Sequence, residues 1–203
     1  MTKKTHKAFG LTVGLATVSA PPVFQYLAES SPITNVAITN GVLLIVGSVL
    51  GSLISDIDNP DSAVGWWCYP FFTKFYKKKP EEKPVFLWHR HFTHSFWVAL
   101  LAGLFCLIPY KLSWVSLFAF SAGFALGILS HIFSDWFMSG VALFSPLSEK
   151  KFSLLHLEAN PRTQTQRMVE KKQKAQKWCD IIFRYVSRVL NGLLLARGVM
   201  LWT

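Results

Sequence analysis

Four long apolar stretches alternate with polar segments along this chain of 203 residues. They run from Ala8 to Ala28, from Val36 to Ile54, from Phe92 to Pro109 and from Trp114 to Met138. Each covers roughly 18–25 residues, the length that an α-helix needs to cross a hydrocarbon core of about 30 Å. The pattern therefore predicts an all-α fold, a polytopic membrane bundle of about four transmembrane helices. Pro21 and Pro22 are expected to kink or shorten the first of them.

The last part of the chain has a different pattern. Residues 149–177 are polar and basic, and from Trp178 to Trp202 apolar residues alternate with Arg184, Arg188 and Arg197. This predicts a basic amphipathic helix that lies on the membrane or against the rest of the protein. A fifth span is disfavoured because it would bury arginines in lipid. We therefore predict a four-helix transmembrane domain over residues 1–148 and a basic cytoplasmic or interfacial helical region over residues 149–203.

Composition and charge add an orientation to this picture. Hydrophobic residues make up 51% of the chain and the mean hydropathy is +0.32, as in a small polytopic membrane protein. The net charge of +10 suits either nucleic acid or an anionic lipid surface. Lysine and arginine gather before the first stretch, within residues 55–91 and after the fourth, whereas residues 29–35 have none. This asymmetry places the N-terminus and both basic segments in the cytoplasm, so anionic membrane lipids, and not nucleic acid, are the expected partners.

Histidines and aspartates gather at the ends of the apolar stretches. The set comprises His6, Asp56, Asp58, His89, His94, His131 and Asp135. By the orientation above, all of them lie at the cytoplasmic edge of the membrane. Imidazole and carboxylate are the usual ligands of zinc, manganese and iron in hydrolytic sites, so we predict a site for one or two divalent metal ions there. Cys68, Cys106 and Cys179 are far apart and odd in number, which predicts free thiols.

The spacing of these residues supports a metal site but has plainer explanations. His131 and Asp135 are four residues apart and share one face of a helix, which suits two ligands of one ion. Asp56 and Asp58 could turn two carboxylates toward one ion or bridge two. Alternatively, a histidine at a membrane edge is often only interfacial, and the Asp-Asn-Pro-Asp string is ordinary turn chemistry. The joint placement favours the metal site, because ionisable residues beside a span are rare unless they are functional.

The motifs that carry these residues resemble a known family. The strings SDIDNPDS (Ser55–Ser62), HRHFTHS (His89–Ser95) and SHIFSD (Ser130–Asp135), with THKAFG (Thr5–Gly10), are similar in order and spacing to the YdjM-like family. Members of that family are described as inner-membrane, LexA-regulated, metal-dependent hydrolases. The similarity covers about residues 5–160 and includes the segment from Gly140 to Pro146. Asn59 stands where the family has histidine, and His91 where it has glycine.

The resemblance implies a hydrolase of the bacterial inner membrane and supplies no substrate. The position of the site at the level of the headgroups favours a phosphoester or another ester of a lipid or lipid-linked molecule. In this hypothesis the His and Asp set above holds the metal, and Arg90 binds an anionic group of a lipid or lipid-linked substrate. Thr93 and Ser95 orient the histidines, and Asp58 or Asp135 acts as a base toward the attacking water. The alternative is a non-enzymatic metal-binding membrane protein, a sensor or a scaffold. A transporter is disfavoured because the middles of the spans are apolar.

Overall fold

The computed structural model describes residues 3–20, 23, 25, 29, 34–59, 62, 64–68, 90, 92–155 and 166–202. Its main helices are α1 (Lys3–Val18), α3 (Thr34–Ile54), α5 (Phe96–Phe105), α6 (Leu107–Lys111), α7 (Val115–Met138) and α8 (Gln166–Trp202). Two short 3-10 turns, η1 (Ser55–Asp58) and η4 (Phe92–His94), follow α3 and precede α5. Within the described residues there is no β-strand, only an isolated bridge between Val141 and Phe152. The predicted all-α fold is confirmed.

Two helical segments are long and apolar enough to cross a membrane. They are Val36–Asp58, which joins α3 to η1, and α7. The third predicted stretch forms a shorter apolar segment, Phe96–Lys111, in which α5 and α6 meet at Cys106. The first stretch begins inside α1, which ends at Val18, before the two prolines. The structure therefore supports two of the four predicted spans by length and composition, and leaves the other two as predictions.

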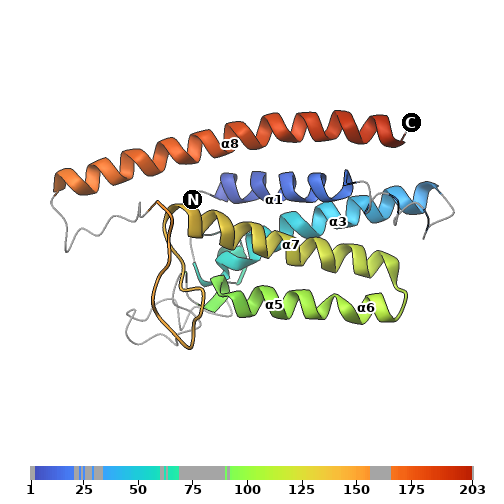
Figure 1. Cartoon of the computed structure of the whole chain (residues 1–203), viewed down its shortest axis with the longest axis horizontal. Helices are drawn as coiled ribbons and strands as arrows, with labels where there is room; N and C mark the ends of the chain where they lie inside the picture. The colour runs from blue at the N-terminus through green and yellow to red at the C-terminus, as the bar shows by residue number, and fades with distance from the viewer. Residues whose placement is uncertain are drawn as a thin grey trace.

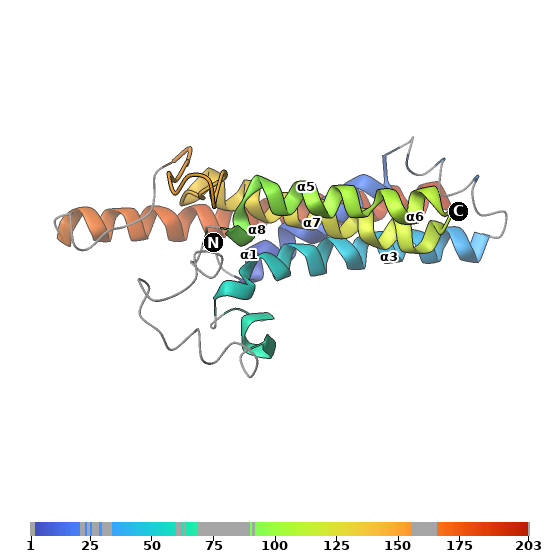
Figure 2. The same cartoon turned by 90° about the horizontal axis from the view of Figure 1, so that it is seen from below.

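The helices run side by side along one direction (Figures 1 and 2). The single long helix α8 lies against α1 on one side of the bundle, and α5 and α6 lie on the opposite side of α7 (Figure 1). The start of α1, the turn η1, the turn η4 and the end of α7 all meet at the same end of the molecule. Four segments that are distant in sequence are thus brought to one place.

The bundle carries small polar groups inside and large apolar side chains outside. Asn40, Ser48, Ser52 and Ser134 are fully buried. Apolar side chains on α3, α5 and α7 are exposed instead, namely Val42, Val46, Leu50, Leu101, Leu104, Phe105, Leu117, Leu129 and Phe133. Contiguous apolar surface on this scale is unfavourable in water. The distribution suits helices that meet lipid on their outer faces and each other through small residues.

Glycines allow α3 and α7 to approach closely. The residues are Gly47 and Gly51 on α3, and Gly123 and Gly127 on α7. A Cβ atom at any of the four would collide with backbone of the other helix; at Gly127 it would collide with the carbonyl of Ser48 and press on the amide of Ser52. Because both helices contribute a pair spaced by four residues, their backbones meet along a continuous line. This contact fixes η1 relative to the end of α7.

The segment after α7 folds back and holds the start of α5. Gly140 adopts a left-handed conformation with φ of +99°, and its amide bonds the carbonyl of Asp135, so the helix stops there. The amide of Ala142 then donates to the carbonyl of Arg90, and the amide of Phe96 donates to the carbonyl of Leu143. These hydrogen bonds link Arg90 and Phe96, on either side of η4, to the segment that follows α7.

The first turns of α1 anchor α8. Thr5 Oγ1 donates a buried hydrogen bond of 2.6 Å to Asp180 Oδ1. Asp180 also pairs with Arg184, whose Nη2 lies 3.4 Å from Oδ2. The helix expected on the membrane or against the protein therefore packs on the bundle and follows α1. The packing of α8 on α1 also forms a basic groove between the two helices.

Candidate metal centre

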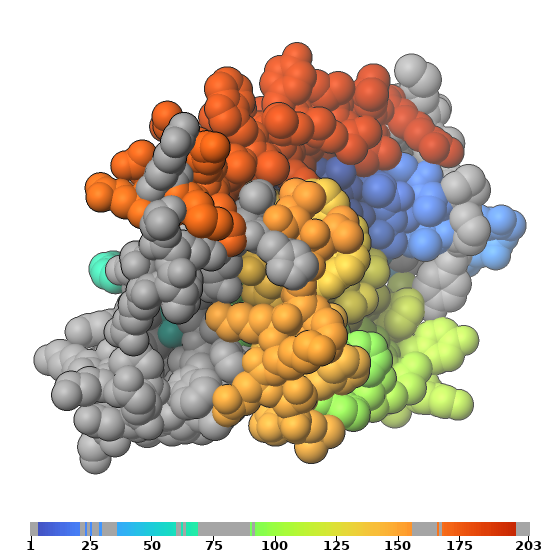
Figure 3. Space-filling model, turned by 60° about the vertical axis from the view of Figure 1, so that its left-hand side comes forward, coloured from blue at the N-terminus to red at the C-terminus, as the bar shows by residue number. Residues whose placement is uncertain are grey.

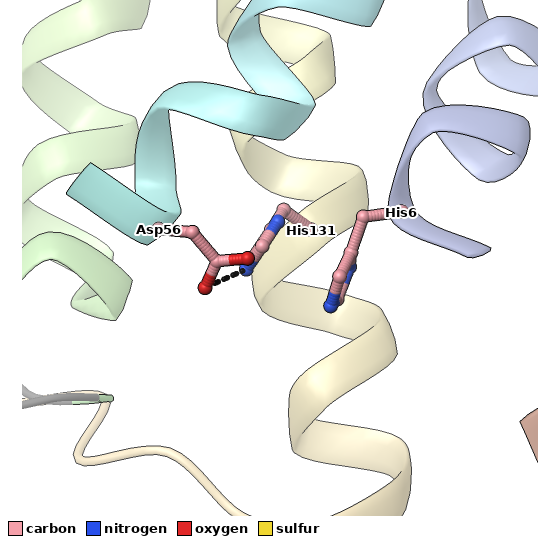
Figure 4. A group of neighbouring side chains, drawn as sticks. All are labelled: His6, Asp56 and His131. Carbon is pink, nitrogen blue, oxygen red and sulfur yellow. Dashed lines mark ion pairs between the residues drawn. The ribbon is translucent and has the colours of Figure 1, made fainter. Parts of the chain in front are cut away.

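Four segments contribute the side chains of the centre. His6 comes from α1, Asp56 from η1, His94 from η4, and His131 and Asp135 from α7. Figure 4 shows three of them, with Asp56 paired to His131 and the ring of His6 alongside. The rings of His6 and His131 are stacked, with centroids 3.7 Å apart and an interplanar angle of 15°. All of these residues are buried except Asp56, whose side chain is 14% exposed.

Four donor atoms converge in the middle. His94 Nε2 lies 3.0 Å from His131 Nε2, 3.6 Å from Asp56 Oδ1 and 3.5 Å from Asp135 Oδ2. His131 Nε2 lies 3.5 Å from Asp56 Oδ1 and 3.8 Å from Asp135 Oδ2. Ligand atoms bound at 2.0–2.1 Å to a tetrahedral zinc ion are about 3.3–3.4 Å apart. The residues therefore fit a divalent metal ion, in both chemistry and spacing.

Hydrogen bonds fix the tautomer of the two central histidines. His131 Nδ1 faces the carbonyl oxygen of Ser52 at 2.5 Å, and a carbonyl can only accept, so Nδ1 carries the proton. Thr93 Oγ1 donates to Asp58 Oδ2 at 3.0 Å and lies 2.9 Å from His94 Nδ1. Since the only proton of that hydroxyl goes to Asp58, the Nδ1 of His94 must donate to it. In the neutral form of each ring, Nε2 then carries the lone pair that can bind a metal ion.

His6 is oriented by the same logic. Ser134 Oγ donates to the carbonyl of His131 at 2.8 Å and lies 3.1 Å from His6 Nδ1, so Nδ1 is the donor. Burial, together with the neighbouring His131, holds the pKa of His6 well below its ordinary value. Its Nε2 lies 3.5 Å from Asp135 Oδ1. His6 extends the centre on the second oxygen of Asp135.

These assignments create a clear electrostatic requirement. Two imidazole lone pairs face each other across 3.0 Å, and two carboxylates adjoin them in a buried space. Two neutral rings in this arrangement repel each other unless a metal ion lies among the four atoms, or one ring takes up a second proton and donates it across the 3.0 Å gap. Outer groups that orient histidines in this way are characteristic of metal sites. A group of His94, His131 and Asp135, and a second of His6, Asp56 and His131, could each hold an ion.

Comparison with known proteins agrees with this geometry. The family model described as YdjM inner membrane protein matches residues 1–198. The chain belongs to the YdjM family. No curated protein and no solved structure matches it. The match confirms the resemblance of the motifs over nearly the whole chain. It also identifies the chain as a member of an inner-membrane family. The description of the family does not mention hydrolysis.

Two predicted residues of this YdjM-family protein, Asp58 and Arg90, contact side chains of the centre, His94 and Asp135 respectively. Asp58 lies behind His94, with Oδ2 at 3.9 Å from Nδ1, and accepts hydrogen bonds from the amide of Arg90 and from Thr93. It faces the outer side of the ring, where it is placed to orient His94 and not to share its ion. Arg90 pairs with Asp135, with Nε 3.3 Å from Oδ2. The φ of Arg90 is +64°, which allows its amide to face Asp58.

The side chain of Thr93 orients His94 as predicted. Ser95 is fully buried, but its hydroxyl has no hydrogen-bond partner among the described residues. His89 and His91 lie outside the described residues, so their predicted roles stay predictions. Sequence reasoning missed Ser52 and Ser134; the position of Ser134 inside the SHIFSD string, between His131 and Asp135, was the available signal.

Thr93 provides a direct test of the orienting bonds. Thr93→Val keeps the shape of the side chain but removes the link between Asp58 and His94. Because outer partners of histidine ligands typically contribute this much, we expect metal affinity to fall by about 10- to 100-fold. Competition against a chelator of known affinity measures the change. Thr93→Ser should restore affinity, and Thr17→Val, which loses only a bond within α1 to the carbonyl of Val13, should leave it unchanged. Equal affinity in Thr93→Val and the wild type would contradict the assigned tautomer of His94.

Proposed function

We propose that this YdjM-family protein is a metal-dependent hydrolase that acts at the cytoplasmic face of the inner membrane. Its substrate is a phosphoester or ester of a lipid or lipid-linked molecule. The observation that carries the proposal is the facing pair of Nε2 atoms of His94 and His131, 3.0 Å apart, with the carboxylates of Asp56 and Asp135 within 3.8 Å of both. A bound divalent ion at such a place acts as a Lewis acid and lowers the pKa of a coordinated water.

The proposed topology is multi-pass, with the N-terminus in the cytoplasm. It is supported by the position of the centre at the end of the bundle where α1 begins (Figure 1). Lys4 and Lys7 flank His6 there. Positive charge close to a span favours the cytoplasmic side. The centre then lies at the depth of the lipid headgroups, which is why we favour a lipid or a lipid-linked substrate over a soluble one.

Each residue of the centre has a distinct part in this proposal. His94, His131, Asp56 and Asp135 hold the ion, which is zinc, manganese or iron. His6, on the second oxygen of Asp135, is placed to hold a proton or to bind a second ion. Thr93 and Asp58 keep His94 in the required tautomer. We therefore assign the proton-holding role to His6 in place of Asp58, which lies on the far side of the His94 ring.

Arg90 is the residue assigned to the substrate. Its side chain is partly exposed, at 14%, beside the buried Asp135. Its Nε lies 3.3 Å from Asp135 Oδ2. The negative charge of Asp135 would therefore act on both the guanidinium and the bound metal ion. A guanidinium can bind the oxygens of a phosphate in a bidentate manner. An anionic phosphoester approaching the centre would meet Arg90 before it meets the histidines.

The proposal is tested by metal analysis combined with a substrate panel. Protein purified in detergent is analysed for bound transition metals, then incubated with phospholipids, lipid phosphates and chromogenic phosphoesters. We expect near-stoichiometric metal and hydrolysis of at least one phosphoester, lost on chelation and restored by adding back the ion found. Glu149→Gln, which changes an exposed acidic residue, serves as a control that should retain both properties.

The two possible failures have different meanings. Protein that contains the metal but hydrolyses none of the panel, including lipid phosphates in bilayers, would favour the non-enzymatic sensor or scaffold. Protein that contains no transition metal and takes up none on reconstitution would refute the metal centre itself.

A further inference from the structure

The part of α8 that lies beside α1 has its polar side chains inside and its apolar side chains outside. Asp180, Ser187 and Asn191 are buried, at spacings of seven and four residues that place them on one helical face. The outward faces carry exposed Trp178, Ile181, Ile182, Tyr185, Val186, Val189, Leu190 and Leu193. A helix on the surface of a water-soluble protein shows the reverse order. In an inner-membrane family, this inversion indicates that lipid covers the outer side of α8.

A groove lies on the inner side of this helix. It has a volume of about 410 Å³ and is formed by α1, α3 and α8, lined by Lys4, Lys7, Ala8, Leu11, Val49, Arg184, Arg188 and Asn191. The lining therefore combines four cationic side chains with an apolar floor and contains no acidic residue. It shares no residue with the metal centre. Figure 3 shows α8 lying along α1 at the margin of the molecule.

Among the described residues, acidic side chains balance only part of the positive charge of the groove. Arg184 pairs with Asp180 at 3.4 Å, which leaves an excess of positive charge from Lys4, Lys7 and Arg188 in the same small space. Like charges held together in this way repel each other, more strongly beside lipid than in water. An anion bound among them would relieve the repulsion.

Asn191 gives a second and independent indication of a ligand. It is only 9% exposed, and its Oδ1 has no hydrogen-bond partner in the described part of the chain. A buried polar atom without a partner is unfavourable by about 1–3 kcal/mol. Since Asn191 lines the groove, a hydroxyl or ammonium group of a bound molecule could donate to it. The groove thus combines sites for an anion, a hydrogen-bond donor and an apolar body.

We propose that this groove binds an anionic phospholipid of the surrounding membrane. The phosphate lies among Lys4, Lys7, Arg184 and Arg188, and the upper part of an acyl chain covers Ala8, Leu11 and Val49. A headgroup that bears hydroxyls, as in phosphatidylglycerol, also donates to Asn191. Inorganic phosphate would satisfy the cations but leave the apolar floor uncovered, so the lipid is the ligand that matches the whole lining. Bound there, the lipid stabilises the packing of α8 on the bundle.

Native mass spectrometry of the full chain in detergent tests the proposal without any turnover. Phosphatidylglycerol and phosphatidylcholine are titrated separately, and inorganic phosphate and glycerol 3-phosphate serve as soluble competitors. We expect phosphatidylglycerol to bind more tightly than phosphatidylcholine. One basic residue near the surface contributes about fivefold to such binding, so Lys7→Gln with Arg188→Gln should weaken it about thirtyfold. Asn191→Leu, which leaves net charge unchanged, should weaken it about fivefold.

Arg188→Gln alone should weaken binding about fivefold, and Arg197→Gln is its matched control, because it removes one positive charge from the same helix at a position outside the groove. It should bind the lipid like the wild type, and the metal content of every variant should be unchanged, which shows that the bundle is folded. Equal binding of the two lipids, or equal loss in Arg197→Gln and in the groove variants, would overturn the proposal. Displacement of the lipid by equimolar inorganic phosphate would identify a soluble phosphate as the ligand instead. None of these outcomes depends on whether the protein is a hydrolase.

Discussion

Replacing His131 with alanine is expected to remove both the bound metal and all metal-dependent hydrolysis. Its Nε2 lies within 3.0–3.8 Å of the donor atoms of His94, Asp56 and Asp135, and His131 belongs to both groups that could hold an ion. The loss should exceed the roughly 100-fold effect of an outer orienting partner, because an ion ligand itself is removed. Metal content by elemental analysis and hydrolysis of the best substrate are the two measurements.

The variant also tests how the centre contributes to stability. Without His131 and the ion, two buried carboxylates lose their main partners, an effect of about 3–5 kcal/mol when one side of a buried pair is removed. The thermal unfolding midpoint in detergent should therefore fall together with the metal content. Glu149→Gln should change neither. A His131→Ala protein that retains near-stoichiometric metal would show that the ion is bound at another site.

Gly127→Ala is expected to destabilise the protein by about 2 kcal/mol, although it adds only one methyl group. A Cβ at this position collides with the carbonyl of Ser48 and presses on the amide of Ser52. Backbone cannot rotate away as a flexible side chain does, so α3 must move. The carbonyl of Ser52 orients His131, so metal affinity should fall as well. Unfolding in a denaturing detergent and the chelator competition measure the two effects.

Gly103→Ala is the matched control for this prediction. A Cβ at Gly103 meets nothing within 4 Å, and alanine is a better helix former than glycine. We expect this variant to be as stable as the wild type or slightly more stable, with unchanged metal content. If Gly127→Ala and Gly103→Ala behaved alike, the close contact of α3 and α7 would not hold the centre.

The sequence predicted helices well where the apolar pattern was unbroken. The second and fourth stretches appear as α3 and α7, with ends within a few residues of the expected ones. The third was expected to be one helix but divides at Cys106, which the hydrophobic pattern could not indicate because apolar residues continue across the break. The sequence also did not indicate that the apolar face of α8 points away from the bundle. An alternation of arginine with apolar residues reads the same whether the apolar side faces protein or lipid, and only the packing on α1 distinguishes the two.

The sequence was equally informative about which residues meet, and less so about their roles. His6, Asp56, His94, His131 and Asp135 do converge, as their placement at helix ends predicted. The separate part of Asp58 could not be deduced, because an i and i+2 spacing in an irregular turn does not say which carboxylate faces inward. That depends on the conformation of η1, where Asp56 leaves helical geometry with a φ of −85° and a ψ of 16°.

The contribution of His6 to a centre completed by α7 has a consequence for biosynthesis. His6 and Asp135 are roughly 130 residues apart, so at about 5–20 residues per second the ribosome makes them roughly 6–26 s apart. During that interval His6 has no partner from α7, and metal cannot be captured at the finished centre. In the proposed metalloprotein, the ion would therefore enter the centre only after α7 has been made and inserted. In metal-starved cells, newly made chains would retain clustered uncompensated carboxylates and be open to proteolysis, so metal supply would set the abundance of the protein as well as its activity.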